Sequence, residues 1–336
     1  MPVTQQKRQT ELDILRFLAI LAVIAIHASE TLTVQVFNFS LSFHVLIVWC
    51  VPIFFMISGR FFLDPERNVT TKKILVKYVP HIVVAFAVWS AIYTLYYYFT
   101  GSYSGLNIFG VLEQFIEGPY HFWYLYVLIG LYLITPFLRK IAQDDTLLFY
   151  FLILFSVINV ILEYLIYVPK FGTVIETFIK NFDLNMPVGY VGYFMLGYFI
   201  WHKKEKIGKK AEITIYAVGA IALIGTVVAE GLITSELKNA DFVKQYMKPN
   251  VIIYSAAIYT FFIKRISKIN FSDRSAKAFG FLTEMGFGVY CIHALINAFI
   301  KIPASLVLTR TVSIYLISLL LTFLIRKIPV VGKKIT

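Results

Sequence analysis

Residues 11–30 read ELDILRFLAILAVIAIHASE, a nearly unbroken apolar run that contains Asp13, Arg16 and His27. A run of about 20 residues is long enough to cross roughly 30 Å of hydrocarbon as a helix. Backbone polar groups in lipid must be satisfied within their own segment, so a single spanning segment of this kind has to be helical. The stretch therefore predicts a transmembrane helix that carries Asp13, Arg16 and His27 between its two ends.

The rest of the sequence repeats this apolar pattern. Hydrophobic residues make up 59% of the 336 residues and charged residues 15%, whereas about a quarter of a soluble domain is charged. Apolar blocks predict spans at 11–30, 40–63, 78–99, 122–138, 146–168, 186–201, 211–233, 247–265, 278–300 and 309–326. We expect an all-α, polytopic transmembrane helical bundle of about ten spans, forming a single membrane-embedded domain over 1–336.

The basic residues are unevenly divided between the two sides of such a bundle. Ten spans put 24 of the 31 Lys and Arg residues on one side, and leave on the other Lys170, Lys180, Lys238, Lys244, Lys248, Lys301 and Arg310. Lys and Arg gather in cytoplasmic loops, so both termini are predicted to be cytoplasmic, in the cell membrane. The net charge of +12 is then explained by topology and anionic lipid, and we expect no nucleic-acid partner.

The three ionisable residues of the first span share one stripe. At 100° per residue, Arg16 and His27 lie within about 20° of one face, and Asp13 lies about 60° from Arg16. Asp13 and Arg16 could anchor the helix at the headgroups, and His27 could make an interhelical hydrogen bond. Because an ionisable group in lipid costs roughly 2.5 kcal/mol or more, a functional role is the other interpretation. Neutral His27 would then be a general base for a hydroxyl, oriented by Glu30 or by another span.

Further polar residues occur in three other predicted spans. They are Ser58 and Arg60 in the second, His121, Trp123 and Tyr124 in the fourth, and Glu284, Tyr290, His293 and Asn297 in the ninth. Spacing places Tyr290, His293 and Asn297 on one helix face. Interfacial aromatic belts and interhelical hydrogen bonds are the structural alternatives for these positions.

Common motifs of soluble enzymes are absent from the sequence. There is no Walker loop, dinucleotide glycine motif, HExxH zinc helix or GxSxG elbow. Cys50 and Cys291 lie in apolar blocks, where an isolated thiol usually packs as a small hydrophobe. We therefore expect no metal and no tightly bound cofactor.

Four sequence blocks occur in order along almost the whole chain. They are LDILR at 12–16 followed by His27, VPIFFMISG at 51–59, HFWYL at 121–125 with YLITP at 132–136, and GVYCIH at 288–293. Each block alone is weakly specific, but together they resemble the acyltransferase-3 family of integral membrane acyltransferases, particularly the surface-polysaccharide O-acetyltransferases.

This resemblance implies a membrane O-acyltransferase that moves an acyl group, usually acetyl, to a hydroxyl of a cell-envelope glycan or lipid-linked sugar. Acyl-CoA from the cytoplasm would be the donor substrate. The resemblance implies that His27 is the catalytic base and that Arg16 is required, with Asp13 beside it. The candidate substrate-binding residues are Ser58, Arg60, His121, Trp123, Tyr124, Tyr290 and His293.

Several alternatives remain open at the level of sequence. The family commonly has an aromatic residue where this chain has Arg60, which could contact a phosphate or snorkel to the headgroups. Transfer could be direct or pass through an acyl-histidine. The alternative function is an exporter or flippase of a polysaccharide or lipid-linked sugar, and a membrane sensor or anchor is a third. The sequence indicates neither the acceptor glycan, the acyl group nor the oligomeric state.

Overall fold

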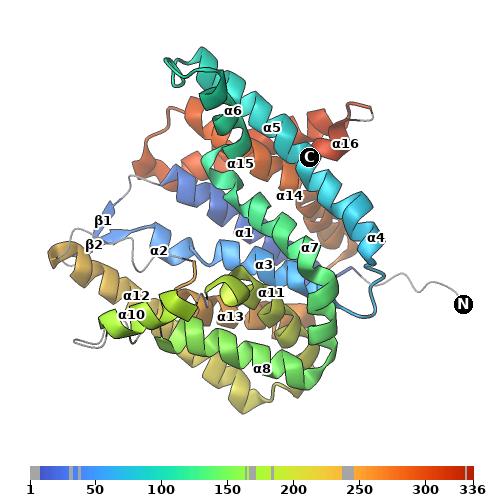
Figure 1. Cartoon of the computed structure of the whole chain (residues 1–336), viewed down its shortest axis with the longest axis vertical. Coiled ribbons are helices and arrows are strands. Elements are labelled where there is room, and N and C mark those ends of the chain that lie inside the picture. The colour runs from blue at the N-terminus through green and yellow to red at the C-terminus, as the bar shows by residue number, and fades with distance from the viewer. Residues whose placement is uncertain are drawn as a thin grey trace, which may run out of the picture.

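The computed structural model describes residues 8–29, 33–36, 39–162, 165, 172–182, 185–236, 246–329 and 331–336. In these ranges the chain is almost entirely helical, as predicted (Figure 1). The longer helices are α1 (Thr10–Ala28), α3 (Cys50–Leu63), α5 (Val79–Phe99), α6 (Ile108–Glu117), α7 (Trp123–Gln143), α8 (Asp145–Ser156), α10 (Gly172–Phe182), α11 (Asn185–Lys203), α12 (Lys209–Glu236), α13 (Pro249–Lys264), α14 (Asp273–Phe299) and α15 (Val307–Arg326).

Short elements connect these helices. They are α2 (His44–Ile47), α4 (Thr71–Lys73), η1 (Ile74–Tyr78), η2 (Tyr120–Phe122), η3 (Val157–Leu162), η4 (Lys204–Lys206), η6 (Ile266–Lys268), η7 (Ala304–Leu306) and α16 (Gly332–Ile335). Two strands, β1 (Thr33–Val36) and β2 (Phe39–Ser42), pair antiparallel with Thr33 opposite Ser42. This pair was not predicted, and it is a small exception to the all-α fold.

Seven helices in the described ranges are long and apolar enough to span a membrane. They are His44–Leu63, Thr71–Phe99, Tyr120–Gln143, Asp145–Leu162, Lys209–Glu230, Asp273–Phe299 and Ala304–Arg326. Each coincides with one of the ten predicted spans. The chain is therefore a membrane protein, and the total of ten spans stays a prediction.

The other three predicted spans are helices with features that distinguish them from the seven. Helix α1 carries Glu11, Asp13 and Arg16 within its first two turns. Helix α11 has non-helical dihedrals at Gly189. Helix α13 has 16 residues, which corresponds to about 24 Å and is short for a hydrocarbon core of about 30 Å.

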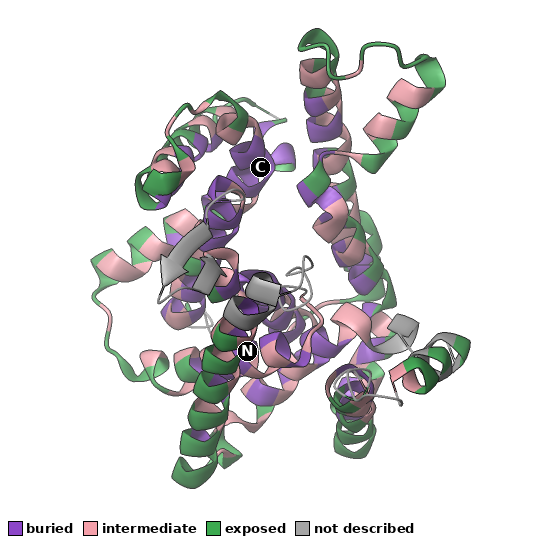
Figure 2. Ribbon diagram, turned by 90° about the vertical axis from the view of Figure 1, so that its left-hand side faces the viewer, coloured by how far each residue is buried: buried purple, intermediate pink, exposed green. Residues whose placement is uncertain are grey.

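Helix α1 occupies the interior of the bundle. It packs against α3, α14 and α15, and Figure 1 shows it between α14 and α15 on one side and α3 on the other. Figure 2 shows buried residues inside the bundle and exposed residues along the outer helices. The outer residues include large apolar side chains such as Ile221, Ile224, Leu308 and Leu316, which is the pattern expected of a surface that faces lipid.

Helices α3 and α11 approach each other at the level of the backbone. A Cβ atom added to Gly59 would lie 1.8 Å from the carbonyl oxygen of Phe194, and one added to Gly197 would lie 2.1 Å from that of Met56. Small residues permit this kind of close contact between membrane helices. The two glycines therefore fix α3, which carries Ser58, against α11.

Replacing Gly59 by alanine is expected to destabilise the protein by at least about 1–3 kcal/mol, because a backbone carbonyl cannot rotate away from an added methyl group. The measurement is the thermal unfolding temperature of the purified protein in detergent, followed by tryptophan fluorescence. Gly130→Ala is the matched control, since nothing lies within 4 Å of its added Cβ. Equal stability of the two variants would contradict the proposed contact.

Candidate functional site

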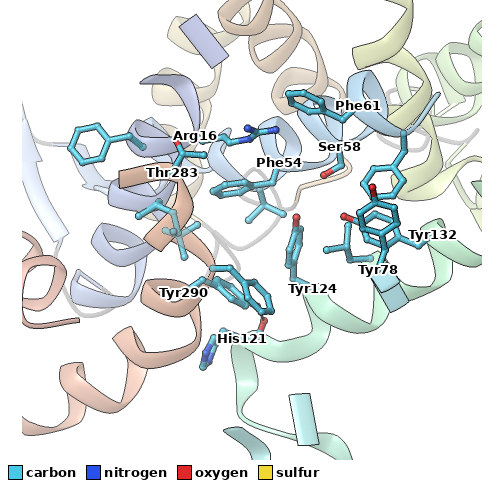
Figure 3. Close-up of a pocket in the computed structure, with 18 of the residues that line it drawn as sticks. Arg16, Phe54, Ser58, Phe61, Tyr78, His121, Tyr124, Tyr132, Thr283 and Tyr290 are labelled. Atoms are coloured by element: carbon cyan, nitrogen blue, oxygen red, sulfur yellow. Dashed lines mark hydrogen bonds between the residues drawn. The ribbon is translucent and has the colours of Figure 1, made fainter. Parts of the chain in front are cut away.

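A cavity of about 490 Å³ lies among α1, α3, α7 and α14. Figure 3 shows Arg16 and Phe61 towards one side of it and His121 and Tyr290 towards the other, with Tyr124 between them. Its walls include seven of the predicted site residues, namely Arg16, His27, Ser58, His121, Trp123, Tyr124 and Tyr290. Residues from four distant parts of the sequence therefore meet in one cavity.

The α1 wall of the cavity is the stripe predicted from helical periodicity. Arg16, Ile20, Val23 and His27 follow one another at intervals of four, three and four residues, and all of them line the cavity. This spacing keeps them on one face of the helix. Eleven residues separate Arg16 from His27, so the stripe extends about 16 Å. His27 thus faces a cavity rather than lipid.

Arg16 is held at its end of the cavity by a carboxylate and an aromatic ring. Its Nη1 lies 3.6 Å from Oδ1 of Asp13, and its Cζ lies 4.4 Å from the centre of the Phe61 ring. Asp13 is buried and also accepts a 2.6 Å hydrogen bond from Nε of Arg8. Asp13 does not line the cavity. Its carboxylate interacts with two arginines, of which Arg16 lines the cavity.

A second cation, Arg67, lies at the same end of the cavity. Its Cζ is 4.1 Å from the centre of the Phe61 ring, so this ring contacts two guanidinium groups. Burial lowers the pKa of Arg67 from its ordinary value, and nearby Arg60 acts in the same direction. Arginine nevertheless keeps its charge in proteins. This end of the cavity can accordingly bind an anionic group.

Three histidines gather around the other end of the cavity. The ring centre of His27 lies 5.4 Å from that of His293 and 6.3 Å from that of His121, and the last two lie 4.9 Å apart. His121 and His293 are buried. Neither ring nitrogen of His121 nor Nε2 of His293 has a hydrogen-bond partner in the described residues. Buried polar atoms without partners are uncommon and mark sites for water or ligand.

Side chains from neighbouring helices fix the backbone around these histidines. The Tyr290 hydroxyl donates a 2.5 Å hydrogen bond to the carbonyl oxygen of His121. The Asn297 amide donates to the carbonyl oxygen of His27 at 3.2 Å and accepts from Arg310 at 2.9 Å. His293 is oriented by its own helix, because its Nδ1 lies 2.6 Å from the carbonyl oxygen of Tyr290. Such contacts hold the residues around a site in fixed positions.

Arg60 lies outside the cavity wall, in a buried cluster between α3 and α11. Its Nη1 donates a 2.5 Å hydrogen bond to Asp64, and its Cζ lies 4.0 Å from the centre of the Trp201 ring. Only 3% of Arg60 is exposed. The side chain therefore neither faces the cavity nor extends to a headgroup, and it stabilises the loop that leads to Arg67.

Several residues of the cavity wall were not predicted from the sequence. Arg67 had no signal beyond its positive charge, which adds to the predicted excess of basic residues on one side. Its loop follows the 51–59 block. Tyr78 ends η1, a π-helical turn, and such turns are frequent at functional sites but leave no clear sequence signal. Tyr132 belonged to the 132–136 block without being selected. Tyr246 and Thr283 had no signal that would have distinguished them. Glu30 lies outside the described residues.

The chain matches a protein-family model. A model described as an acyltransferase domain, that of the acyltransferase-3 family, matches residues 9–327. No curated protein and no solved structure matches the chain. The matched range covers nearly the whole sequence and includes every residue of the cavity wall.

Proposed function

Because the chain belongs to the acyltransferase-3 family, we propose that this membrane acyltransferase moves an acyl group from cytoplasmic acyl-CoA to a hydroxyl of a cell-envelope glycan or lipid-linked sugar. Acetyl is the favoured acyl group. The observation that carries the proposal is the single cavity that joins the cationic end at Arg16 and Arg67 to the histidine end at His27. Acyl-CoA serves as a substrate, and no resident cofactor is invoked.

The two ends of the cavity suit the two parts of an acyl-CoA. Its phosphates would lie by Arg16 and Arg67, because guanidinium groups form strong charge-assisted hydrogen bonds to phosphate. Its extended arm would follow the apolar stripe of Ile20 and Val23. The thioester would then lie near His27, about 16 Å along the helix from Arg16.

The proposed reaction is direct transfer with His27 as general base. A neutral imidazole nitrogen of His27 takes the proton of the acceptor hydroxyl while the hydroxyl oxygen attacks the carbonyl carbon of the thioester. The carbon–sulfur bond breaks, and the departing CoA thiolate takes the proton back from the imidazolium. Ester and free CoA thiol are the products, so atoms and charge balance without a further reactant.

The proposal is tested with radiolabelled acetyl-CoA and membranes that contain or lack the protein. We expect label to enter the envelope glycan only where the protein is present, and mild alkali to release it as acetate. Purified protein should also bind acetyl-CoA. Failure to bind acetyl-CoA would overturn the proposal and favour the transporter alternative, since a flippase has no use for it.

We also propose that the membrane domain extends over 1–336, which the family match over 9–327 supports. It would lie in the plasma membrane with both termini cytoplasmic, which the excess of Lys and Arg on one side supports. Cysteine reporters test this topology, because Cys50 and Cys291 are 0% exposed and should not react with an impermeant maleimide. We expect Ser102→Cys to be labelled on intact cells and Lys206→Cys only after permeabilisation. The reverse pattern would contradict the proposed orientation.

A further inference from the structure

A second pocket lies directly beside the histidine end of the cavity. It measures about 320 Å³ and is lined by Glu117, Gly118, Pro119, Tyr120, Trp123 and Tyr126. Trp123 also lines the central cavity. The ring centre of Tyr120 lies 4.9 Å from that of His27. One layer of side chains therefore separates this pocket from the proposed base.

The pocket is formed by the turn between α6 and α7. Gly118 has a φ of 72°, and a Cβ at this position would lie 3.0 Å from Oγ of Ser90. Glycine is thus suited to the turn by its backbone conformation and by the space available. The Tyr126 hydroxyl donates to the carbonyl oxygen of Ile116, which attaches the end of α6 to α7. These contacts give the pocket a defined shape.

The chemistry of this pocket differs from that of the cationic end of the cavity. Its lining has one carboxylate, three aromatic rings and no Lys or Arg. A carboxylate accepts hydrogen bonds from hydroxyl groups, and pockets with aromatic walls and few polar groups bind small organic ligands. Glu117 would repel a phosphate or another anion, which selects against anionic ligands. The lining favours an uncharged ring that carries several hydroxyls.

The position of α6 agrees with a ligand that arrives at the membrane surface. Ile108, Phe109, Leu112 and Ile116 of this short helix are exposed, while Glu113 and Glu117 lie on the same helix and are exposed as well. A short helix with exposed apolar groups and a charged face is suited to lie at a lipid–water interface. A glycan unit presented at that interface would meet the pocket before it met the central cavity.

We propose that this pocket is the acceptor subsite, and that it binds an uncharged sugar unit by a hydrogen bond to Glu117 and contacts with Tyr120, Trp123 and Tyr126. The inference rests on the proposed function and specifies its acceptor. One hydroxyl of the bound sugar extends past Tyr120 to His27, whose ring is in contact with that of Tyr120. Donor and acceptor then approach the histidine from different compartments.

The test uses purified full-length protein in detergent, acetyl-CoA, and envelope glycan from which mild alkali has removed the esters. Anion exchange separates this glycan into neutral and anionic fractions. We expect Glu117→Gln to raise the KM for the neutral fraction about tenfold or more, since it weakens a hydrogen bond to a charged group. The KM for acetyl-CoA should be unchanged. Glu113→Gln, one turn earlier on α6, is the matched control and should behave as wild type.

Two results would overturn the acceptor assignment while leaving acyl transfer intact. The first is a KM for the neutral fraction that is the same in Glu117→Gln and Glu113→Gln. The second is transfer by the wild-type protein to the anionic fraction and not to the neutral fraction, which would identify an anionic acceptor. A wild-type protein that transfers no acetyl to either fraction would overturn the proposed function as well. The unfolding temperature of each variant shows that the protein is folded.

Discussion

Replacing His27 by glutamine is expected to slow acyl transfer by roughly 10²–10⁴-fold, which is the usual contribution of a general base. Glutamine retains hydrogen-bonding capacity and similar bulk but cannot take a proton from the acceptor hydroxyl. The effect should appear in kcat, because the proposed site for the phosphates of the donor lies at the other end of the cavity. Initial rates of label transfer from acetyl-CoA to envelope glycan measure it.

A matched histidine variant separates this effect from general damage. His202 is exposed at the end of α11 and stacks on Tyr198, with ring centres 5.4 Å apart. His202→Gln should transfer acyl groups at the wild-type rate. Acetyl-CoA binding by the His27→Gln protein should also be preserved. Undiminished transfer by that protein would rule out the base mechanism.

Replacing Arg16 by alanine is expected to raise the KM for acyl-CoA by about 30-fold or more. Removing one partner of a buried, hydrogen-bonded charge pair costs about 2–5 kcal/mol, and every 1.4 kcal/mol is a factor of ten in affinity. Part of this loss of binding free energy would arise because Asp13, without Arg16, keeps only its hydrogen bond from Arg8. The measurement is binding of radiolabelled acetyl-CoA together with steady-state rates.

Two further substitutions make the Arg16 result specific. Arg16→Lys keeps the positive charge but cannot form a bidentate contact with phosphate, so its KM should lie between those of Arg16→Ala and wild type. Arg274→Ala removes an exposed arginine from the first turn of α14. This variant should change neither the KM for acyl-CoA nor the binding of acetyl-CoA. An unchanged KM for acyl-CoA in the Arg16→Ala protein would show that the phosphates bind elsewhere.

The sequence predicted the helical elements of the site well, because their determinants are local. Seven predicted spans coincide with helices that can cross a membrane, and the length and polarity of each segment are sufficient for that inference. The stripe from Arg16 to His27 needed only the helical period. The resemblance to the acyltransferase-3 family is confirmed by the match over 9–327.

Features that depend on contacts between distant segments could not be predicted. Arg60 turns from the cavity because Asp64 and Trp201 surround its guanidinium, and Trp201 lies on a helix far along the chain. The second pocket, which is lined by Glu117 and Tyr120, depends on how α6 attaches to α7. No periodic pattern in a single segment encodes such an arrangement. The roles proposed for His27 and Arg16 stay predictions until the variants are measured.

The backbone contact between α3 and α11 has a consequence for the opening of the cavity. Two helices in contact at Gly59 and Gly197 cannot slide or tilt independently without a steric clash, so α11 holds the α3 wall of the cavity in place. Helix α14 also lines the cavity, and a Cβ added to its Gly286 would meet only the side chain of Ile20, at 3.9 Å. We therefore expect any widening of the cavity that admits a ligand to involve movement of α14 rather than of α3.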